Sequence, residues 1–103
     1  MKKMSSKIKI KICGLKEVSE LKCAADYGAF WYGMIFFKKS PRNISYKKAE
    51  FLMSNTPKSI RPVAVTVNPS IVLVEQIINL GIKDIQLHGA ETVKFCNQLK
   101  NDY

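Results

Sequence analysis

Apolar and polar residues alternate at the start of the chain with the period of a β-strand. Residues 7–12 alternate lysine with isoleucine, and Cys13 and Gly14 then end the pattern. Lys11 and Cys13 therefore share one face of the predicted strand, and the isoleucines share the other. The isoleucine face is suited to packing under helices, so the lysine and cysteine face is expected to point away from them.

Helical and strand-like segments alternate along the rest of the chain. Helical spacing of apolar residues, with capping and stop residues, predicts helices over residues 17–27, 45–55, 69–80 and 91–100. Asn68 is the predicted cap of the third helix, with Pro69 in its first turn. Continuous apolar or β-branched runs predict strands over residues 30–37, 61–67 and 83–87. Strand followed by helix, four times over, predicts an α/β fold with a parallel sheet and right-handed crossovers.

Length and charge narrow the range of functions. The chain has 103 residues, which is enough for one domain at most. Its 17 Lys and Arg against 8 Asp and Glu give a net charge of +9, which is compatible with nucleic acid, an anionic membrane or a phosphorylated ligand. Only Arg42 and Arg61 are arginines, and the lysines are spread along the chain. Most of the charge is therefore interpreted as solvated surface, and no nucleic-acid partner is expected.

Three cysteines and one histidine make neither a disulfide framework nor a metal site. The cysteines at 13, 23 and 96 are far apart and form no C-x-x-C pair. The basic N-terminus begins like a secretion signal, but Lys9 and Lys11 interrupt the apolar run that such a signal requires. No stretch approaches the roughly 18 apolar residues of a membrane span. We therefore expect a cytoplasmic protein without a metal, a cofactor or a membrane partner.

Cys13 is the first candidate for chemistry. In parallel α/β proteins, side chains at the C-terminal ends of strands face the crevice where ligands bind. Lys11 lies one strand repeat away, about 7 Å, on the same face. A nearby cation favours the thiolate form of a cysteine, so Cys13 is a candidate base or nucleophile. The competing interpretation is a buried cysteine that acts as a small apolar residue.

Four separated motifs occur in order at the ends of the predicted strands and together span nearly the whole chain. They are Lys11–Leu15 (KICGL), Gly33–Phe36 (GMIF) leading to Lys39–Arg42 (KSPR), Val65–Pro69 (VTVNP) and Gln86–Gly89 (QLHG). Together they resemble one family, phosphoribosylanthranilate isomerase, a (β/α)8-barrel enzyme of tryptophan biosynthesis. The resemblance implies that residues 1–103 form one partial domain, the first four β/α units of a TIM barrel with helices on the outer face. Residues 1–6 are expected to be frayed.

The resemblance also implies an activity and three site residues. The family catalyses an Amadori rearrangement of N-(5-phosphoribosyl)anthranilate to 1-(o-carboxyphenylamino)-1-deoxyribulose 5-phosphate, an aldose–ketose type isomerisation. Cys13 matches the general base, and Arg42 matches the arginine that binds the anthranilate carboxylate. His88 is a candidate for lining the substrate pocket, although a lone histidine often only satisfies nearby backbone groups. Asp84 shares the face of His88 and is a candidate partner for Lys11.

Some parts of the family pattern are missing or altered. Phe30, Ala90 and Glu17 occupy positions where the family usually has other residue types. The family enzyme is about twice this length, and its general acid and phosphate-binding loops belong to later strands. The chain alone is therefore expected to be inactive, and either to self-associate or to be completed by a C-terminal half. The alternatives are another phosphosugar barrel enzyme and, from net charge alone, a basic nucleic-acid-binding module.

Overall fold

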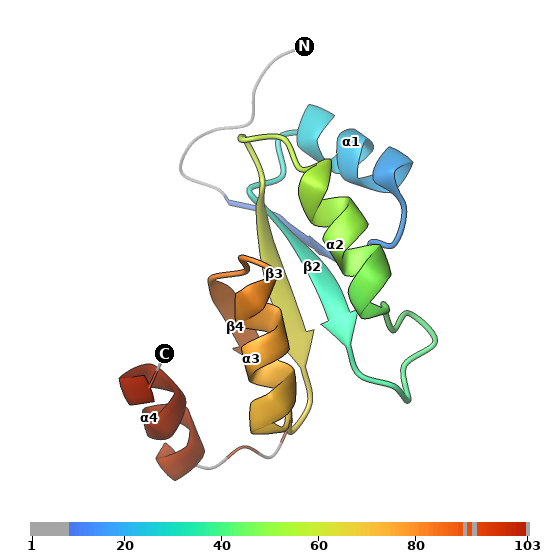
Figure 1. The fold of residues 1–103 in the computed structure, drawn as a ribbon. Helices are drawn as coiled ribbons and strands as arrows, with labels where there is room; N and C mark the ends of the chain where they lie inside the picture. Colours follow the sequence, from blue (N-terminus) through green and yellow to red (C-terminus); the bar gives the residue numbers. More distant parts are fainter. Residues whose placement is uncertain (1–8, 90, 92, 103) are drawn as a thin grey trace.

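Four parallel strands alternate with four helices in the computed structural model, which describes residues 9–89, 91 and 93–102 (Figure 1). The strands are β1 (Lys11–Cys13), β2 (Trp31–Phe36), β3 (Arg61–Thr66) and β4 (Asp84–Leu87). The helices are α1 (Val18–Asp26), α2 (Tyr46–Ser54), α3 (Ile71–Asn79) and α4 (Val93–Asp102). The sheet order is β1-β2-β3-β4 with every neighbouring pair parallel, which confirms the predicted α/β fold. The segment expected to be frayed, residues 1–6, lies outside the described residues.

The two faces of the sheet differ in what they contact. Alternate residues of β2, namely Tyr32, Met34 and Phe36, are buried in the apolar core beneath the helices. Ile12 of β1 faces the same way and lines a space beside α1. Strand alternation therefore places Lys11 and Cys13 on the opposite face, which we call the open face. The core comprises Leu15, Leu21, Ala24, Ala29, Tyr32, Met34, Phe36, Ile44, Ala49, Leu52, Ile60, Ala64, Ile77 and Ile82.

Serine side chains begin the second and third helices. The Ser45 hydroxyl accepts a hydrogen bond from the backbone N–H of Lys48, as predicted for an N-cap. The predicted cap of the third helix is wrong by two residues, because Ser70 caps α3 and Asn68 does not. Asn68 has a φ of 44°, the left-handed conformation that asparagine tolerates, and it turns the chain between β3 and α3. The Ser70 hydroxyl, directly before α3, accepts a hydrogen bond from the backbone N–H of Leu73.

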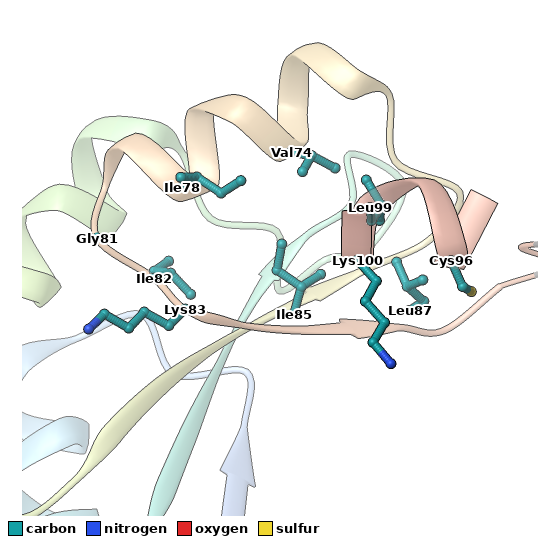
Figure 2. Close-up of a pocket in the computed structure, with 10 residues that line it drawn as sticks. All are labelled: Val74, Ile78, Gly81, Ile82, Lys83, Ile85, Leu87, Cys96, Leu99 and Lys100. Carbon is teal, nitrogen blue, oxygen red and sulfur yellow. The ribbon is translucent and has the colours of Figure 1, made fainter. Parts of the chain in front are cut away.

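The fourth helix packs more loosely than the other three, and Figure 1 shows it set apart from them. None of its described residues is fully buried, and Val93 is 77% exposed. A cavity of about 620 Å³ separates α4 from α3 and β4 (Figure 2). Ile78 of α3 lines this cavity and is 36% exposed. The helix face of β4 is therefore covered incompletely.

Candidate active site

Cys13 lies at the C-terminal end of β1 on the open face, beside a glycine of the neighbouring strand. Cys13 pairs with Gly33 in the sheet register. A Cβ atom at Gly33 would lie 3.0 Å from the Cys13 Sγ and 3.2 Å from a methyl group of Val65. The missing side chain at Gly33 therefore makes room for the half-buried thiol. The sulfur does not turn under the helices, where it would be excluded from a ligand.

Arg42 reaches from the loop between β2 and α2 to the turn that follows Cys13. A Cβ at Gly14 would lie 2.7 Å from the Arg42 Nη1 and 2.9 Å from its Cδ, so the arginine side chain lies across this glycine. Gly14 has a φ of 83°, and its N–H donates to the Gly33 carbonyl over 2.8 Å. The Arg42 backbone N–H donates to the Ser40 hydroxyl over 3.1 Å, which shapes the loop. The fold thus places Arg42 against Gly14, the residue that directly follows Cys13.

His88 lies at the other side of the open face, directly after β4. Its backbone N–H donates to the Thr66 carbonyl over 2.8 Å, which extends the pairing of β3 and β4 by one residue. Its ring Nδ1 is 3.4 Å from the Gln86 Nε2. The Lys11 Nζ donates to the Gln86 Oε1, so side chains of the first and fourth strands meet across the open face. Strand alternation places Gln86 on the face of His88, but its contact with Lys11 was not predicted.

The charged residues of the open face pair differently from the expectation. Asp84 was the predicted partner of Lys11, but its carboxylate forms a salt bridge of 3.0 Å with the Arg61 guanidinium. Asp84 begins β4 and Arg61 begins β3, so this pair lies toward the N-terminal ends of the strands. The Lys11 side chain is long enough to extend beyond the Arg61–Asp84 pair and contact Gln86 instead. Within the described residues, no hydrogen bond links His88 to Cys13 or Arg42.

The structure gives no support to a metal centre or a membrane span. Among residues 9–89, 91 and 93–102, no group of three or more His, Cys, Asp or Glu is placed to hold a metal ion. In the same residues, no helix is both long and apolar enough to cross a membrane. Cys23 and Cys96 are exposed on α1 and α4.

Glu91 joins the loop after β3 to the loop that carries His88. One carboxylate oxygen accepts the Asn68 backbone N–H over 2.7 Å, and the other accepts the Gly89 N–H over 2.8 Å. Desolvation alone would raise the pKa of Glu91, but these backbone donors and the nearby His88 together lower it. The carboxylate therefore holds the two loops together more strongly in its ionised form.

Acid should weaken this link between the loops. Because the pKa of folded Glu91 is lowered, its contribution to stability is present above the ordinary value of 4.5 and is lost as the pH falls through the folded value. Glu91→Gln should therefore reduce the free energy of unfolding, measured with urea, more at pH 6.5 than at pH 3. Glu75→Gln, at an exposed position on α3, is the matched control. An equal effect of Glu91→Gln at both pH values would contradict the assignment.

Comparisons with known proteins match this chain to one protein family. The profile of the family described as N-(5'phosphoribosyl)anthranilate (PRA) isomerase matches residues 10–103. The N-(5'-phosphoribosyl)anthranilate isomerase of Legionella pneumophila (strain Corby) is 39% identical over 99 residues, which cover 95% of this chain and 48% of that protein. The relative from Trichodesmium erythraeum is 39% identical over 95 residues, or 91% of this chain and 41% of its own length.

Solved structures agree with the sequence comparison. The crystal structure of phosphoribosyl anthranilate isomerase from Thermotoga maritima has a TM-score of 0.86 and 26% identity, covering 92% of this chain and 47% of that one. A phosphoribosyl anthranilate isomerase in complex with reduced 1-(o-carboxyphenylamino)-1-deoxyribulose 5-phosphate has the same TM-score and identity, with 91% and 49% coverage. The chain thus spans about half the length of the relatives that it matches.

Proposed function

The chain belongs to the N-(5'-phosphoribosyl)anthranilate isomerase family, and we propose that it forms the first four β/α units of that enzyme's (β/α)8 barrel. Four parallel strands in sequential order, with their apolar face toward the helices, are the pattern of consecutive barrel units. The match to about half of each solved barrel supports the same assignment. Residues 1–103 then make up one partial domain.

The proposed reaction is the Amadori rearrangement of N-(5-phosphoribosyl)anthranilate. The observation that carries this proposal is that Cys13 ends β1 on the open face while the Arg42 side chain lies across Gly14, the next residue. Once the sugar ring has opened to a protonated Schiff base, the Cys13 thiolate removes the proton from sugar C2. The C–H electron pair forms the C1=C2 double bond while the C=N π pair moves to the nitrogen, and the resulting enaminol takes up a proton at C1 and loses its O2 proton to give the ketone.

Arg42 and His88 bind the substrate in this proposal. The planar Arg42 guanidinium can pair two donors with the two oxygens of the anthranilate carboxylate, and its exposed position leaves it accessible to a ligand. His88 lines the pocket from the β4 side. The general acid that opens the ring and the loops that hold the phosphate come from the other four units of the barrel.

The edges of the sheet support completion by further strands. Within the described residues, β1 pairs only with β2, and β4 pairs only with β3. An unpaired edge strand exposes backbone N–H and C=O groups that favour pairing with another strand. We infer that a C-terminal (β/α)4 half fills this role, whereas a second copy of the chain would close the sheet without supplying a general acid.

Complementation tests the proposed function. We expect no isomerase turnover from the chain alone, and turnover when it is co-produced with the C-terminal half of the Legionella pneumophila relative. Substrate and product can be quantified by chromatography, with the C-terminal half alone as the control. Saturable turnover by the chain alone, or a well-folded but inactive combined barrel, would overturn the proposal.

A further inference from the structure

Three side chains form a hydrogen-bonded series across the open face, from the first strand to the last. The ammonium of Lys11 on β1 donates to the Oε1 of Gln86 on β4. The Nε2 of the same Gln86 amide lies 3.4 Å from the Nδ1 of His88. Lys11 and Gln86 are half-buried, and His88 is exposed at the strand end where the proposed pocket opens.

The chemistry of lysine fixes the direction of this series. An ammonium group has three donors and no acceptor, so only the amide oxygen of Gln86 can face Lys11. The amide NH₂ must then face His88, where it can only donate. The facing ring nitrogen, Nδ1, therefore accepts, and a neutral imidazole that accepts at Nδ1 carries its single proton on Nε2. The reversed amide would place two donor groups against each other at the lysine.

We propose that Gln86, oriented by Lys11, is a positioning residue that holds neutral His88 as the Nε2–H tautomer. This inference rests on the proposed function, in which His88 lines the substrate pocket. In that tautomer His88 donates a hydrogen bond, so it recognises an acceptor oxygen of the phosphorylated, carboxylate-bearing substrate rather than one of its N–H groups. Lys11 thereby influences the ligand through Gln86 and His88, in addition to its effect on Cys13.

The backbone around His88 supports this positioning role. The His88 N–H donates to the Thr66 carbonyl, and the next residue, Gly89, donates to the Glu91 carboxylate. The main chain on both sides of the ring is therefore held, and the side chain retains its χ angles as the main freedom. One hydrogen bond at Nδ1 restricts that freedom and defines which nitrogen is available to a ligand.

Nitrogen NMR of the chain tests the proposal directly. The sequence contains one histidine, so a ¹⁵N-histidine-labelled sample gives one set of ring signals. At a pH where the ring is neutral, we expect the shift and coupling pattern of the Nε2–H tautomer, with Nδ1 as the acceptor. A predominant Nδ1–H pattern in the unmodified chain would overturn the proposal.

Two substitutions distinguish a positioning role from a general structural one. In Gln86→Glu the isosteric carboxylate still accepts from Lys11 but cannot donate, so the ring pattern should invert to Nδ1–H or become that of the imidazolium. In Lys11→Met the amide is free to reverse, so the Nε2–H pattern should give way to a mixture of tautomers. An unchanged ¹⁵N pattern of the His88 ring in either folded variant would overturn the proposal. If Gln86→Glu does not fold, the result for Lys11→Met is sufficient to test it.

Lys9→Met is the matched control. Lys9 precedes β1 by two residues and places its Nζ 4.6 Å from the centre of the Phe30 ring, outside the Lys11–Gln86–His88 series. We expect it to leave the histidine pattern unchanged, and an equal disturbance by Lys9→Met would overturn the proposal. If the tautomer is confirmed but the complemented barrel is inactive, only the proposed function fails.

Discussion

Cys13→Ser is expected to lower the kcat of the complemented barrel by about 10²- to 10⁴-fold, the range that a positioned general base contributes. A serine hydroxyl remains protonated near neutral pH, so it cannot take the proton from sugar C2 as a thiolate does. The substitution should not disturb the fold, because an oxygen is smaller than the sulfur that lies beside Gly33. The loss should therefore appear in kcat with little change in the free energy of unfolding.

Cys23→Ser provides the matched control for this experiment. Cys23 is exposed on α1, on the helix side of the sheet, so its replacement should leave turnover unchanged. Full activity of the Cys13→Ser variant would contradict the role of Cys13 as the base. That result would favour a different phosphosugar isomerisation on the same fold.

Arg42→Lys is expected to lower kcat/KM by about 10- to 150-fold, mainly through a higher KM. Lysine keeps the charge but replaces a planar two-donor fork by a point charge, so one of two hydrogen bonds to the carboxylate is lost. A hydrogen bond to a charged group contributes about 1.5–3 kcal/mol, which corresponds to that range. Arg61→Lys is the control, because Arg61 pairs with Asp84 near the N-terminal ends of the strands.

A substrate analogue makes the Arg42 experiment specific. The N-phosphoribosyl derivative of aniline lacks the carboxylate, so the unsubstituted barrel should bind it more weakly than the natural substrate. The Arg42→Lys variant should discriminate less between the two compounds, because the lost bond is the one that the carboxylate accepts. If the variant discriminates as well as the parent, Arg42 does not bind the carboxylate.

The sequence predicts most of the elements, because they depend on local periodicity. The apolar run of β2 predicts its strand closely. The alternation over residues 7–12 predicts a longer strand than β1, since residues 9 and 10 lie outside it and residues 7 and 8 lie outside the described residues. The cap of α3 was misplaced because Asn68 and Ser70 are both good capping residues, and only the turn after β3 decides between them. The burial of the apolar residues of α3 and α4 depends on how closely α4 packs, which local periodicity does not determine.

The arrangement of the candidate site is harder to predict from the sequence than the helices and strands are. The position of Cys13 follows from strand alternation, but the contact of Arg42 with Gly14 depends on how two separate loops meet. The Lys11–Gln86 hydrogen bond joins residues 75 positions apart, and no local pattern predicts it. The roles of Cys13, Arg42 and His88 remain predictions that the experiments above test.

The close approach of Arg42 to Gly14 limits how the specificity of the proposed barrel can evolve. Any side chain at residue 14 would need a strained backbone and would displace the guanidinium, since even a methyl carbon would lie 2.7 Å from Nη1. Directed evolution toward substrates without a carboxylate would therefore encounter these two positions as a coupled pair. Replacing the arginine would remove the clash at residue 14, but the backbone strain at a φ of 83° would remain and would continue to favour glycine.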